Sequence, residues 1–191
     1  MGLDISVSVN NDETVFSDDY HNEENNYFEK HSLSREFCNF ISRQHVVDHK
    51  AELDQIGEIT NVDISPLYEM EDYPDEEELE YELENEEDED EIQHLLLKAA
   101  EQKNKLNGNI DKVLSTVNQL IEKLNHVDNL DNLLIKTDFD TLNNALYFSD
   151  FTLDNGNGYI DNNFGQDLRN FKRFLEFAKQ KGTETVWFTY G

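Results

Sequence analysis

The sequence has little cysteine, proline and positive charge: one Cys, two Pro and 15 Lys or Arg in 191 residues. Because Cys38 is alone, no intramolecular disulfide can form, which is typical of a reducing cytoplasm. No apolar run approaches the roughly 18 residues that a membrane helix needs, and the N-terminal segment has neither the basic nor the apolar region of a signal peptide. We therefore expect a cytoplasmic protein with no membrane partner.

The shortage of positive charge leaves the chain strongly acidic, with 43 Asp or Glu and a net charge of −28. Residues 69–91 alone hold 16 carboxylates and no Lys or Arg. Such a run repels itself and has almost nothing to bury, so it does not fold on its own. Like-charge repulsion also excludes nucleic acid and anionic membrane as partners. This charge favours a basic protein surface or a cation.

Alternating and helical patterns predict an α+β fold. Residues 3–9 alternate apolar and polar side chains, as a half-buried strand does. The run 183–190 alternates in the same way, and residues 146–153 are also typical of a strand. The spacing of Phe and Leu predicts a helix over 164–181, which a glycine ends. The N-terminal strand is expected to join the C-terminal pair in one sheet.

The strongest periodicity follows the acidic run. Over residues 92–127 apolar side chains recur by alternating steps of four and three, an a/d seam that predicts a long helix packed against another helix. Asn107-Gly108-Asn109 lies inside this seam without changing its phase. A kinked continuous helix and a tight helical hairpin both fit the pattern, and we favour the hairpin.

These segments divide the chain into three parts. Residues 1–68 and 137–191 are expected to form one α+β core, residues 69–91 a largely solvated acidic segment, and residues 92–136 a helical arm between the two halves of the core. Part of the acidic segment can form the first turns of the arm, because a helix N-terminus favours carboxylates.

Two groups of residues in the middle of the chain are expected to contact a protein partner. The carboxylates would meet a basic surface. The seam would meet an apolar surface, or a second copy of the chain through residues 92–127. The acidic candidates are Glu76, Glu77, Glu78, Glu86, Glu87 and Asp88, and the apolar candidates are Leu106, Val113 and Leu120.

A candidate metal site lies in the sequence His45-Val46-Val47-Asp48-His49. Two histidines at i and i+4 share a helix face, and the carboxylate between them gives the order of an inverted zinc-protease motif, H-x-x-E-H. Asp48 is shorter than the glutamate of that motif, and no third-ligand motif follows. The alternatives are a zinc-dependent hydrolase centred on His45, Asp48 and His49, and two surface histidines at a helix end.

Two further patterns have both a chemical and a structural interpretation. Cys38 has the nucleophilic chemistry of a thiol, but it lies on the apolar face of a helix that Ser32 or Ser34 caps, where a free cysteine is usually a small core residue. Residues 153–164 resemble the middle of a calcium-binding EF-hand loop, yet Leu and Phe replace its two anchoring carboxylates. We expect no cofactor, with zinc and calcium as the alternatives.

The two ends of the chain resemble an uncharacterised group of small bacterial and phage proteins. The similarity lies in the opening MGLDI, in LSREFCNF, in Phe148-Ser149-Asp150 with the glycine-rich turn after it, and in the final helix and strand. Members of that group begin with MGLD and end in an FSD strand, a turn, an amphipathic helix and a last strand. The resemblance implies an α+β fold and a prokaryotic or phage origin, and it implies no activity.

The function that these observations favour is a non-enzymatic interaction protein whose acidic, helical middle binds a basic or apolar protein surface. Its most specific form is an inhibitor, encoded by a mobile element or phage, that imitates the charge of a nucleic acid. A toxin-neutralising immunity protein has the same chemistry. The alternatives from other classes are the metal-dependent hydrolase, an acidic block that binds divalent cations diffusely, and a solvated insert without a partner.

Overall fold

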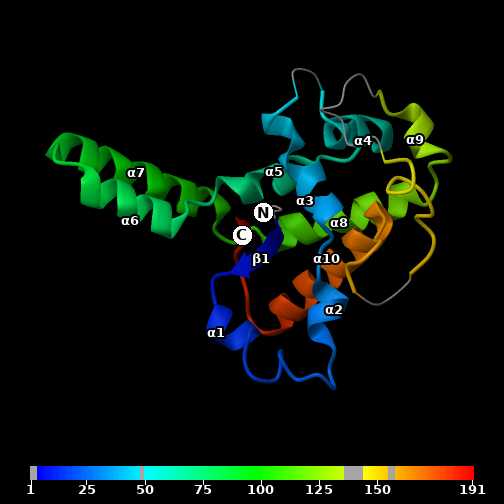
Figure 1. Ribbon diagram of the computed structural model, residues 1–191, viewed down its shortest axis with the longest axis horizontal. Helices are drawn as coiled ribbons and strands as arrows, with labels where there is room; N and C mark the ends of the chain where they lie inside the picture. Colours follow the sequence, from blue (N-terminus) through cyan, green and yellow to red (C-terminus); the bar gives the residue numbers. More distant parts are fainter. Residues whose placement is uncertain (1–3, 48–49, 136–143, 155–157) are drawn as a thin grey trace.

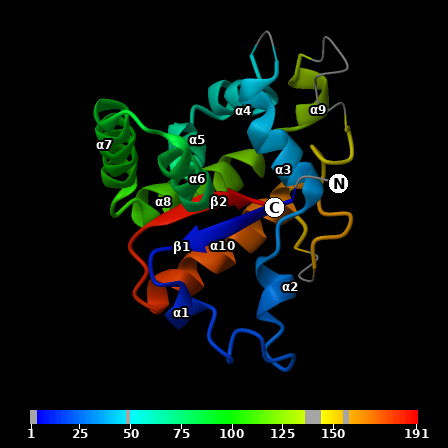
Figure 2. The same cartoon turned by 60° about the vertical axis from the view of Figure 1, so that its left-hand side comes forward.

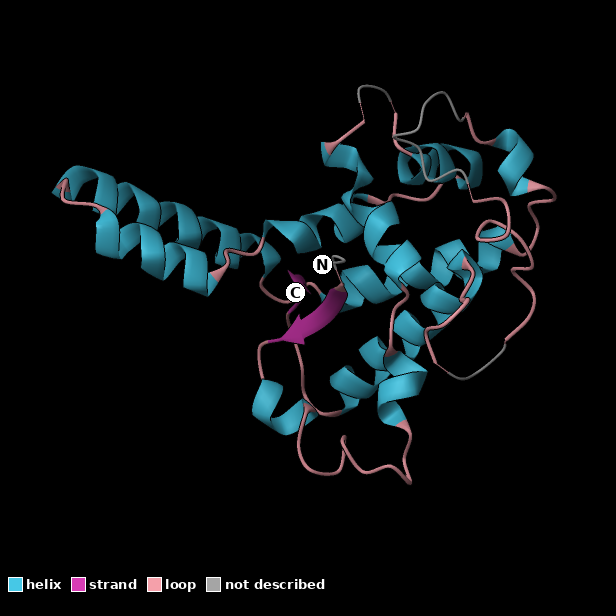
Figure 3. Cartoon of the chain, viewed as in Figure 1, coloured by secondary structure: helices cyan, strands magenta, loops and turns pink. Residues whose placement is uncertain are grey.

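The structure of the protein, a computed structural model, describes residues 4–47, 50–135, 144–154 and 158–191. Helices make up most of it, and a small antiparallel sheet of two strands lies against them (Figure 3). The strands are β1 (Ile5–Val9) and β2 (Val186–Tyr190). This arrangement confirms the predicted α+β class. None of the described helices is long and apolar enough to cross a membrane.

Short helices fill the chain between β1 and the acidic run, and η1 and η2 among them are 3-10 helices. In chain order they are α1 (Asp12–Val15), α2 (Tyr27–His31), α3 (Arg35–Ile41), η1 (Ser42–His45), α4 (Glu52–Thr60), α5 (Ser65–Glu69) and η2 (Met70–Asp72). The later helices are α6 (Glu76–Asn85), α7 (Glu89–Leu106), α8 (Ile110–Leu124), α9 (Leu130–Leu133) and α10 (Phe164–Gln180). Ser34 caps α3 as predicted, because its hydroxyl accepts a hydrogen bond of 3.1 Å from the Phe37 N–H.

The sheet joins the two ends of the described chain. β1 and β2 run antiparallel, with Ile5 opposite Tyr190. Except for Trp187, the apolar residues of both strands face the core, and the polar residues of β1 face outward, as their alternation predicts. Beyond the strands, the backbones of Asp4 and Gly191 exchange hydrogen bonds of 3.2 and 3.1 Å.

The core lies between the sheet and the helices α8 and α10, which pack against each other (Figure 2). The predicted helix over 164–181 is confirmed as α10: the Asn163 side chain accepts a hydrogen bond of 2.8 Å from the Gln166 N–H at its start. Gly182 follows its end with a φ of +89°, a backbone conformation that glycine adopts without strain. The rings of Phe171 and Phe188, 5.7 Å apart between centroids, connect α10 to β2.

The helices α6 and α7 form an antiparallel hairpin, called the arm below, that projects from the core (Figure 1). Asp75 caps α6 by accepting hydrogen bonds of 2.9 Å from the N–H groups of Glu77 and Glu78. Asp88 caps α7 in the same way. Much of the acidic run 69–91 is therefore helical, because its carboxylates fall at caps and first turns, where the helix dipole favours negative charge.

The periodic segment 92–127 is divided between the arm and the core, which corrects two expectations. The helix is interrupted at residues 107–109, and α8 continues into the core. The helix that packs along α7 is therefore α6 and not α8 (Figure 1). Leu106, Val113 and Leu120 are 1%, 0% and 0% exposed. They are not a partner surface: Val113 and Leu120 lie on α8, which packs against α5 and α10 of its own chain, and Leu106, the last residue of α7, is also buried.

Residues 146–152 form turns and bends in place of the predicted strand. The Ser149 N–H donates a 3.3 Å hydrogen bond to the carbonyl three residues before it, and Asp150 has a φ of +53°, which strands do not have. Tyr147 and Phe148, which make the segment resemble a strand, are each 1% exposed. They anchor the turns on the core through their rings, and burial of aromatic residues does not require an extended backbone.

The break between α7 and α8 covers part of the outer edge of the sheet. The Asn109 amide donates a hydrogen bond of 2.8 Å to the Val186 carbonyl and accepts one of 2.9 Å from the Val186 N–H. Beside it, the Gly108 N–H donates to the Thr185 hydroxyl at 3.0 Å. Gly108 reaches this position with a φ of +73°, which favours glycine. Residues 108 and 109 thus stand where a third strand would begin.

Asn109→Ala should lower the free energy of unfolding by about 2–4 kcal/mol, because it leaves the buried N–H and C=O of Val186 without partners. Urea denaturation followed by circular dichroism measures the loss. Asn107→Ala is the matched control, an exposed asparagine two positions away, and should cost less than about 1 kcal/mol. Equal losses in the two variants would contradict the structural role of Asn109.

His31 lies in an aromatic cluster between α2 and α10. It is 8% exposed, its ring stacks on Tyr27 with 5.6 Å between centroids, and its Nδ1 lies 3.3 Å from the Tyr20 hydroxyl. Burial, together with the positive charges of Arg173 and Lys30, lowers the pKa of His31 to about 4. His31 is therefore neutral in the folded chain at neutral pH.

Acid should destabilise the fold through His31. The pKa of this side chain is 6.5 when it is exposed, as in the unfolded chain, and about 4 in the folded chain. Between these two pH values the unfolded chain binds more protons, so the free energy of unfolding falls as the pH falls. Each pKa unit corresponds to about 1.4 kcal/mol, which makes the loss on the order of 3 kcal/mol by pH 4. His31→Phe keeps an aromatic ring and should flatten the dependence of unfolding free energy on pH. Parallel profiles for the two proteins would refute the assignment.

Candidate functional site

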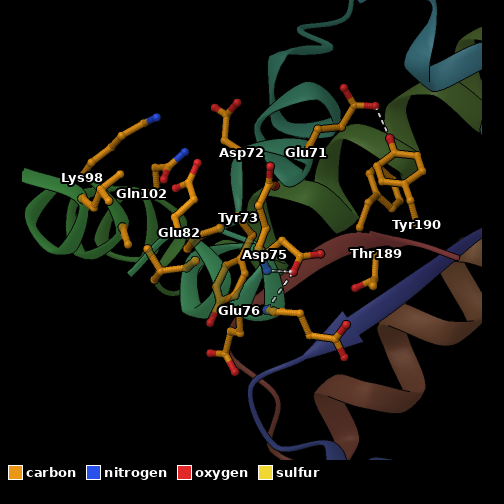
Figure 4. A pocket seen from close by; sticks show the side chains of 17 residues that line it. Glu71, Asp72, Tyr73, Asp75, Glu76, Glu82, Lys98, Gln102, Thr189 and Tyr190 are labelled. Carbon is orange, nitrogen blue, oxygen red and sulfur yellow. Dashed lines mark hydrogen bonds between the residues drawn. The ribbon is translucent and has the colours of Figure 1, made fainter. Parts of the chain in front are cut away.

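A cleft of about 780 Å³ lies where the arm meets the sheet (Figure 4). Its walls come from three separate parts of the chain: the segment from η2 into α6, one side of α7, and the end of β2. In Figure 4, Glu71 and Asp72 approach it from η2, Glu82 from α6, Lys98 from α7 and Tyr190 from β2. This region is called the acidic cleft below.

An aromatic stack holds the arm against the sheet beside the acidic cleft. The rings of Tyr73 and Trp187 lie nearly parallel, at 11°, with 3.9 Å between centroids. The Lys103 Nζ lies 5.6 Å from the centre of the Tyr73 ring and donates a 2.7 Å hydrogen bond to Glu76. This hydrogen bond raises the pKa of Lys103. The start of α6, the end of α7 and β2 therefore meet at one point.

Two further contacts fix η2 at the same place. Lys105 donates a 2.7 Å hydrogen bond to Asp72, and the Tyr190 hydroxyl donates one to Glu71. Burial raises the pKa of Tyr190, and the hydrogen bond with Glu71 raises it further, so the hydroxyl remains a donor. The walls of the acidic cleft are thus connected to one another by side-chain contacts.

The charges that line the acidic cleft are almost all negative. Seven carboxylates and one ammonium, that of Lys98, line it, and Lys103 and Lys105 pair with two of the carboxylates from just outside. Like charges held this close raise one another's energy, and a cation that enters between them lowers it. The seven carboxylates are Glu71, Asp72, Asp75, Glu76, Glu77, Glu78 and Glu82.

The structure separates the six predicted carboxylates into two groups. Residues 76–78 line the acidic cleft. Residues 86–88 form the turn between α6 and α7 at the far end of the arm (Figure 1). There the Glu86 carboxylate accepts hydrogen bonds of 2.9 Å from the N–H groups of Glu87 and Asp88, which closes the turn. The first group faces the sheet and the second is remote from it.

The three predicted apolar contacts lie away from the surface. Leu106, Val113 and Leu120 are buried, so self-association through the seam of α8 cannot occur while the core is folded. The exposed apolar side chains of the arm are others: Tyr81, Leu97 and Leu96 are 69%, 63% and 42% exposed. A small number of exposed apolar side chains is common on protein surfaces.

Two of the three predicted metal ligands, Asp48 and His49, lie outside the described residues, and the third, His45, is the last residue of η1. The calcium-like loop also falls partly outside them, at residues 155–157. In the part of the chain that the structure describes, no group of three or more His, Cys, Asp or Glu is arranged to hold a metal ion. The metal-dependent hydrolase thus stays a prediction without described geometry.

The single cysteine is a core residue. Cys38 is 0% exposed on the inner face of α3, and burial raises the pKa of its thiol to about 11. At neutral pH the thiol is protonated, and a protonated, buried thiol is a poor nucleophile.

A buried carboxyl group, that of Asp167, connects α10 to two other segments. It accepts hydrogen bonds from the Ser34 hydroxyl at 2.5 Å, the Tyr147 hydroxyl at 3.0 Å and the Asn162 amide at 2.9 Å. Burial raises its pKa to about 6 although these donors oppose the shift. Its partners come from the cap of α3 and from the turns before α10, so its role is to hold these segments together.

The sheet side of the acidic cleft was not predicted from the sequence. Its contacts join distant parts of the sequence: Tyr73 stacks on Trp187, and Tyr190 bonds to Glu71. No local pattern in the sequence connects such pairs. The available signal was Trp187, a large aromatic residue on the polar face of a predicted strand. Such a side chain indicates that something covers that face.

Comparisons of the chain with protein-family models, with curated proteins and with solved structures found no match. The resemblance of the two ends to a bacterial and phage group therefore stays a prediction. The geometry and charge of the acidic cleft are the basis for a function.

Tyr73→Ala should loosen the arm from the sheet. Loss of the stack is expected to cost about 1–2 kcal/mol and to move the fluorescence of Trp187, the chain's single tryptophan, to longer wavelength as water reaches the indole. Tyr81→Ala, which removes a 69% exposed tyrosine from α6, should leave the emission unchanged. An unshifted emission maximum in Tyr73→Ala would show that the stack does not hold the arm.

Proposed function

We propose that this protein is a non-enzymatic interaction protein whose acidic cleft binds a basic segment of a protein partner. The observation that carries the proposal is the gathering of seven carboxylates and one lysine at the junction of the arm and the sheet. A cationic side chain that enters this cleft gains attraction to several carboxylates at once, and it also relieves their mutual repulsion.

The net charge of −28 supports the same kind of partner. A field of this sign speeds the approach of a basic protein and repels nucleic acid, anionic membrane and acidic proteins. It therefore supplies specificity at long range, and the acidic cleft supplies the contact. In its most specific form the protein is an inhibitor that competes with a nucleic acid for a basic surface, or an immunity protein that covers a basic toxin.

The walls of the acidic cleft are held in place before a partner arrives, which supports binding. The stack of Tyr73 on Trp187, the pair of Lys103 with Glu76 and the pair of Lys105 with Asp72 fix the walls relative to one another. A preformed site loses less conformational entropy on binding than a flexible acidic tail does. We place the interaction in the cytoplasm, where the free thiol of Cys38 stays reduced.

Removing charge from the acidic cleft should weaken binding of a basic peptide. The probe is the acetylated and amidated heptapeptide Lys-Val-Lys-Val-Lys-Val-Lys, and calorimetry at low salt measures its Kd. The triple variant Glu77→Gln, Glu78→Gln, Glu82→Gln is expected to raise the Kd about tenfold, because each exposed ion pair contributes up to about 1 kcal/mol. Raising the salt concentration should weaken binding to the unmodified protein in the same direction.

The matched control is the triple variant Glu87→Gln, Glu89→Gln, Glu91→Gln. It removes the same charge from the far end of the arm, and like the first variant it changes two carboxylates in the first turn of a helix. Its Kd should rise by less than about threefold, through the long-range field alone. A Kd that does not change with salt concentration, or an equal rise in Kd for the two variants, would rule out recognition by the acidic cleft.

A further inference from the structure

A second cavity, of about 650 Å³, lies beside β1, whereas the acidic cleft lies beside β2, and the two share no lining residue. Its walls come from residues 4–7 at β1, the segment after α1, the stretch from α2 into α3, residues 159–161 and α10. The volume falls in the range of sites that bind small molecules. This region is called the aromatic cavity below, and the proposed function does not use it.

Aromatic rings form much of the wall of the aromatic cavity. Phe16 and Tyr20 meet edge to face, with 5.0 Å between ring centroids and an angle of 84° between the ring planes. Phe28 and Tyr159 meet in the same way, at 6.5 Å and 86°. Rings held at right angles present their negative faces in more than one direction. Sites that bind quaternary ammonium ions are built from aromatic rings in this way.

The rings are buried at one end of the aromatic cavity and exposed at the other. Tyr20 and Phe174 are 6% and 3% exposed, whereas Phe28 and Tyr159 are 61% and 45% exposed. Ile160, next to Tyr159, also lines the cavity and is 75% exposed. The cavity thus has a buried aromatic floor and an apolar mouth that faces solvent. Exposed apolar side chains that gather at the mouth of a cavity indicate a ligand with an apolar part.

The charged side chains of the aromatic cavity favour a cation. Three carboxylates, those of Asp4, Glu36 and Asp161, line it together with one guanidinium, that of Arg35. Arg35 pairs with Asp4 at 3.1 Å, and within the described residues neither Glu36 nor Asp161 forms an ion pair. Two imidazoles also line the cavity, and that of His31 is neutral at neutral pH. The aromatic cavity therefore combines negative ring faces with an excess of negative charge.

We infer that the aromatic cavity binds a small organic ammonium ion that carries an apolar body. The ammonium group is attracted by the ring faces, by Glu36 and Asp161, and by the field of the net charge of −28. The apolar body covers Phe28 and Ile160 at the mouth. A neutral molecule gains only the second of these contributions, and an anion is repelled by the carboxylates. The inference is independent of the partner proposed for the acidic cleft.

Three probes of similar shape and different charge test the inference on the full chain: phenyltrimethylammonium is a cation, tert-butylbenzene is neutral and benzenesulfonate is an anion. NMR titration at about 150 mM salt, where diffuse attraction to surface carboxylates is screened, gives the Kd of each probe. The cation should bind saturably and at least about fivefold more tightly than the neutral probe, and the anion more weakly than either. The methyl protons of the bound cation should shift upfield, because they lie over ring faces.

Variants at the mouth test whether the rings bind the cation. Phe28→Ala combined with Tyr159→Ala should raise the Kd of phenyltrimethylammonium at least about fivefold. Phe28→Tyr combined with Tyr159→Phe keeps both rings and should leave the Kd within about twofold of the unmodified chain. Both side chains are largely exposed, so neither pair of changes should unfold the protein.

A second pair of variants tests the carboxylates. Glu36→Gln combined with Asp161→Asn should raise the Kd of phenyltrimethylammonium about threefold or more. Asp161 has a φ of +58°, which asparagine also adopts, so this change keeps the backbone. The matched control is Asp18→Asn combined with Glu23→Gln, which removes the same charge from exposed residues outside the aromatic cavity and should change the Kd less than twofold.

Two results would overturn the inference. Equal binding of the three probes would show an apolar cavity that does not distinguish charge. An unchanged Kd in Phe28→Ala combined with Tyr159→Ala would show that the cation binds diffusely to carboxylates and not to the rings. Neither result bears on the acidic cleft, because its test uses a peptide and variants of other residues.

Discussion

The hydrogen bonding of β2 along its two edges is the constraint on which the rest of the structure depends. On one edge β1 binds it, and on the other the side chain of Asn109 takes the place of a strand at Val186. Because Asn109 stands between α7 and α8, this contact determines where the arm leaves the core and where α8 begins. Further along β2, η2 packs against the strand and the Tyr190 hydroxyl donates a hydrogen bond to Glu71, so the strand that builds the fold also forms one wall of the acidic cleft.

The fold places most of its excess carboxylates where negative charge costs little free energy. Carboxylates of the acidic run lie at the caps and first turns of α6 and α7, where backbone N–H groups point toward them. The arm projects into solvent, which keeps most of these charges away from the core (Figure 1). The exception is the junction with the sheet, where seven carboxylates meet around one cleft. A protein that needed only solubility would have no reason to hold them together there with Tyr73, Lys103 and Lys105.

Local patterns predicted much of the fold, because alternation marks β1 and β2 and helical spacing marks α10. The heptad seam showed which faces of α7 and α8 are apolar, but a seam does not identify what covers it: α6 covers α7, and the core covers α8. Residues 146–153 were wrongly predicted as a strand, because buried aromatic residues give a similar sequence pattern in strands and turns. The acidic wall of the cleft was predictable from the charge of residues 69–91. The sheet side of the cleft depends on the contact of Tyr73 with Trp187, which joins distant parts of the sequence and leaves no local signal.

The central claim is that the acidic cleft, and not the acidic arm in general, binds a basic segment of a protein partner. NMR of the labelled chain, titrated with the peptide Lys-Val-Lys-Val-Lys-Val-Lys, tests it most directly. We predict that the largest changes in amide chemical shift fall on residues that line the cleft, such as Glu77, Glu78 and Thr189, and that residues 86–88 at the far end of the arm change little. Changes as large at residues 86–88 as at the cleft would contradict the claim, because the peptide would then follow the negative charge wherever it lies.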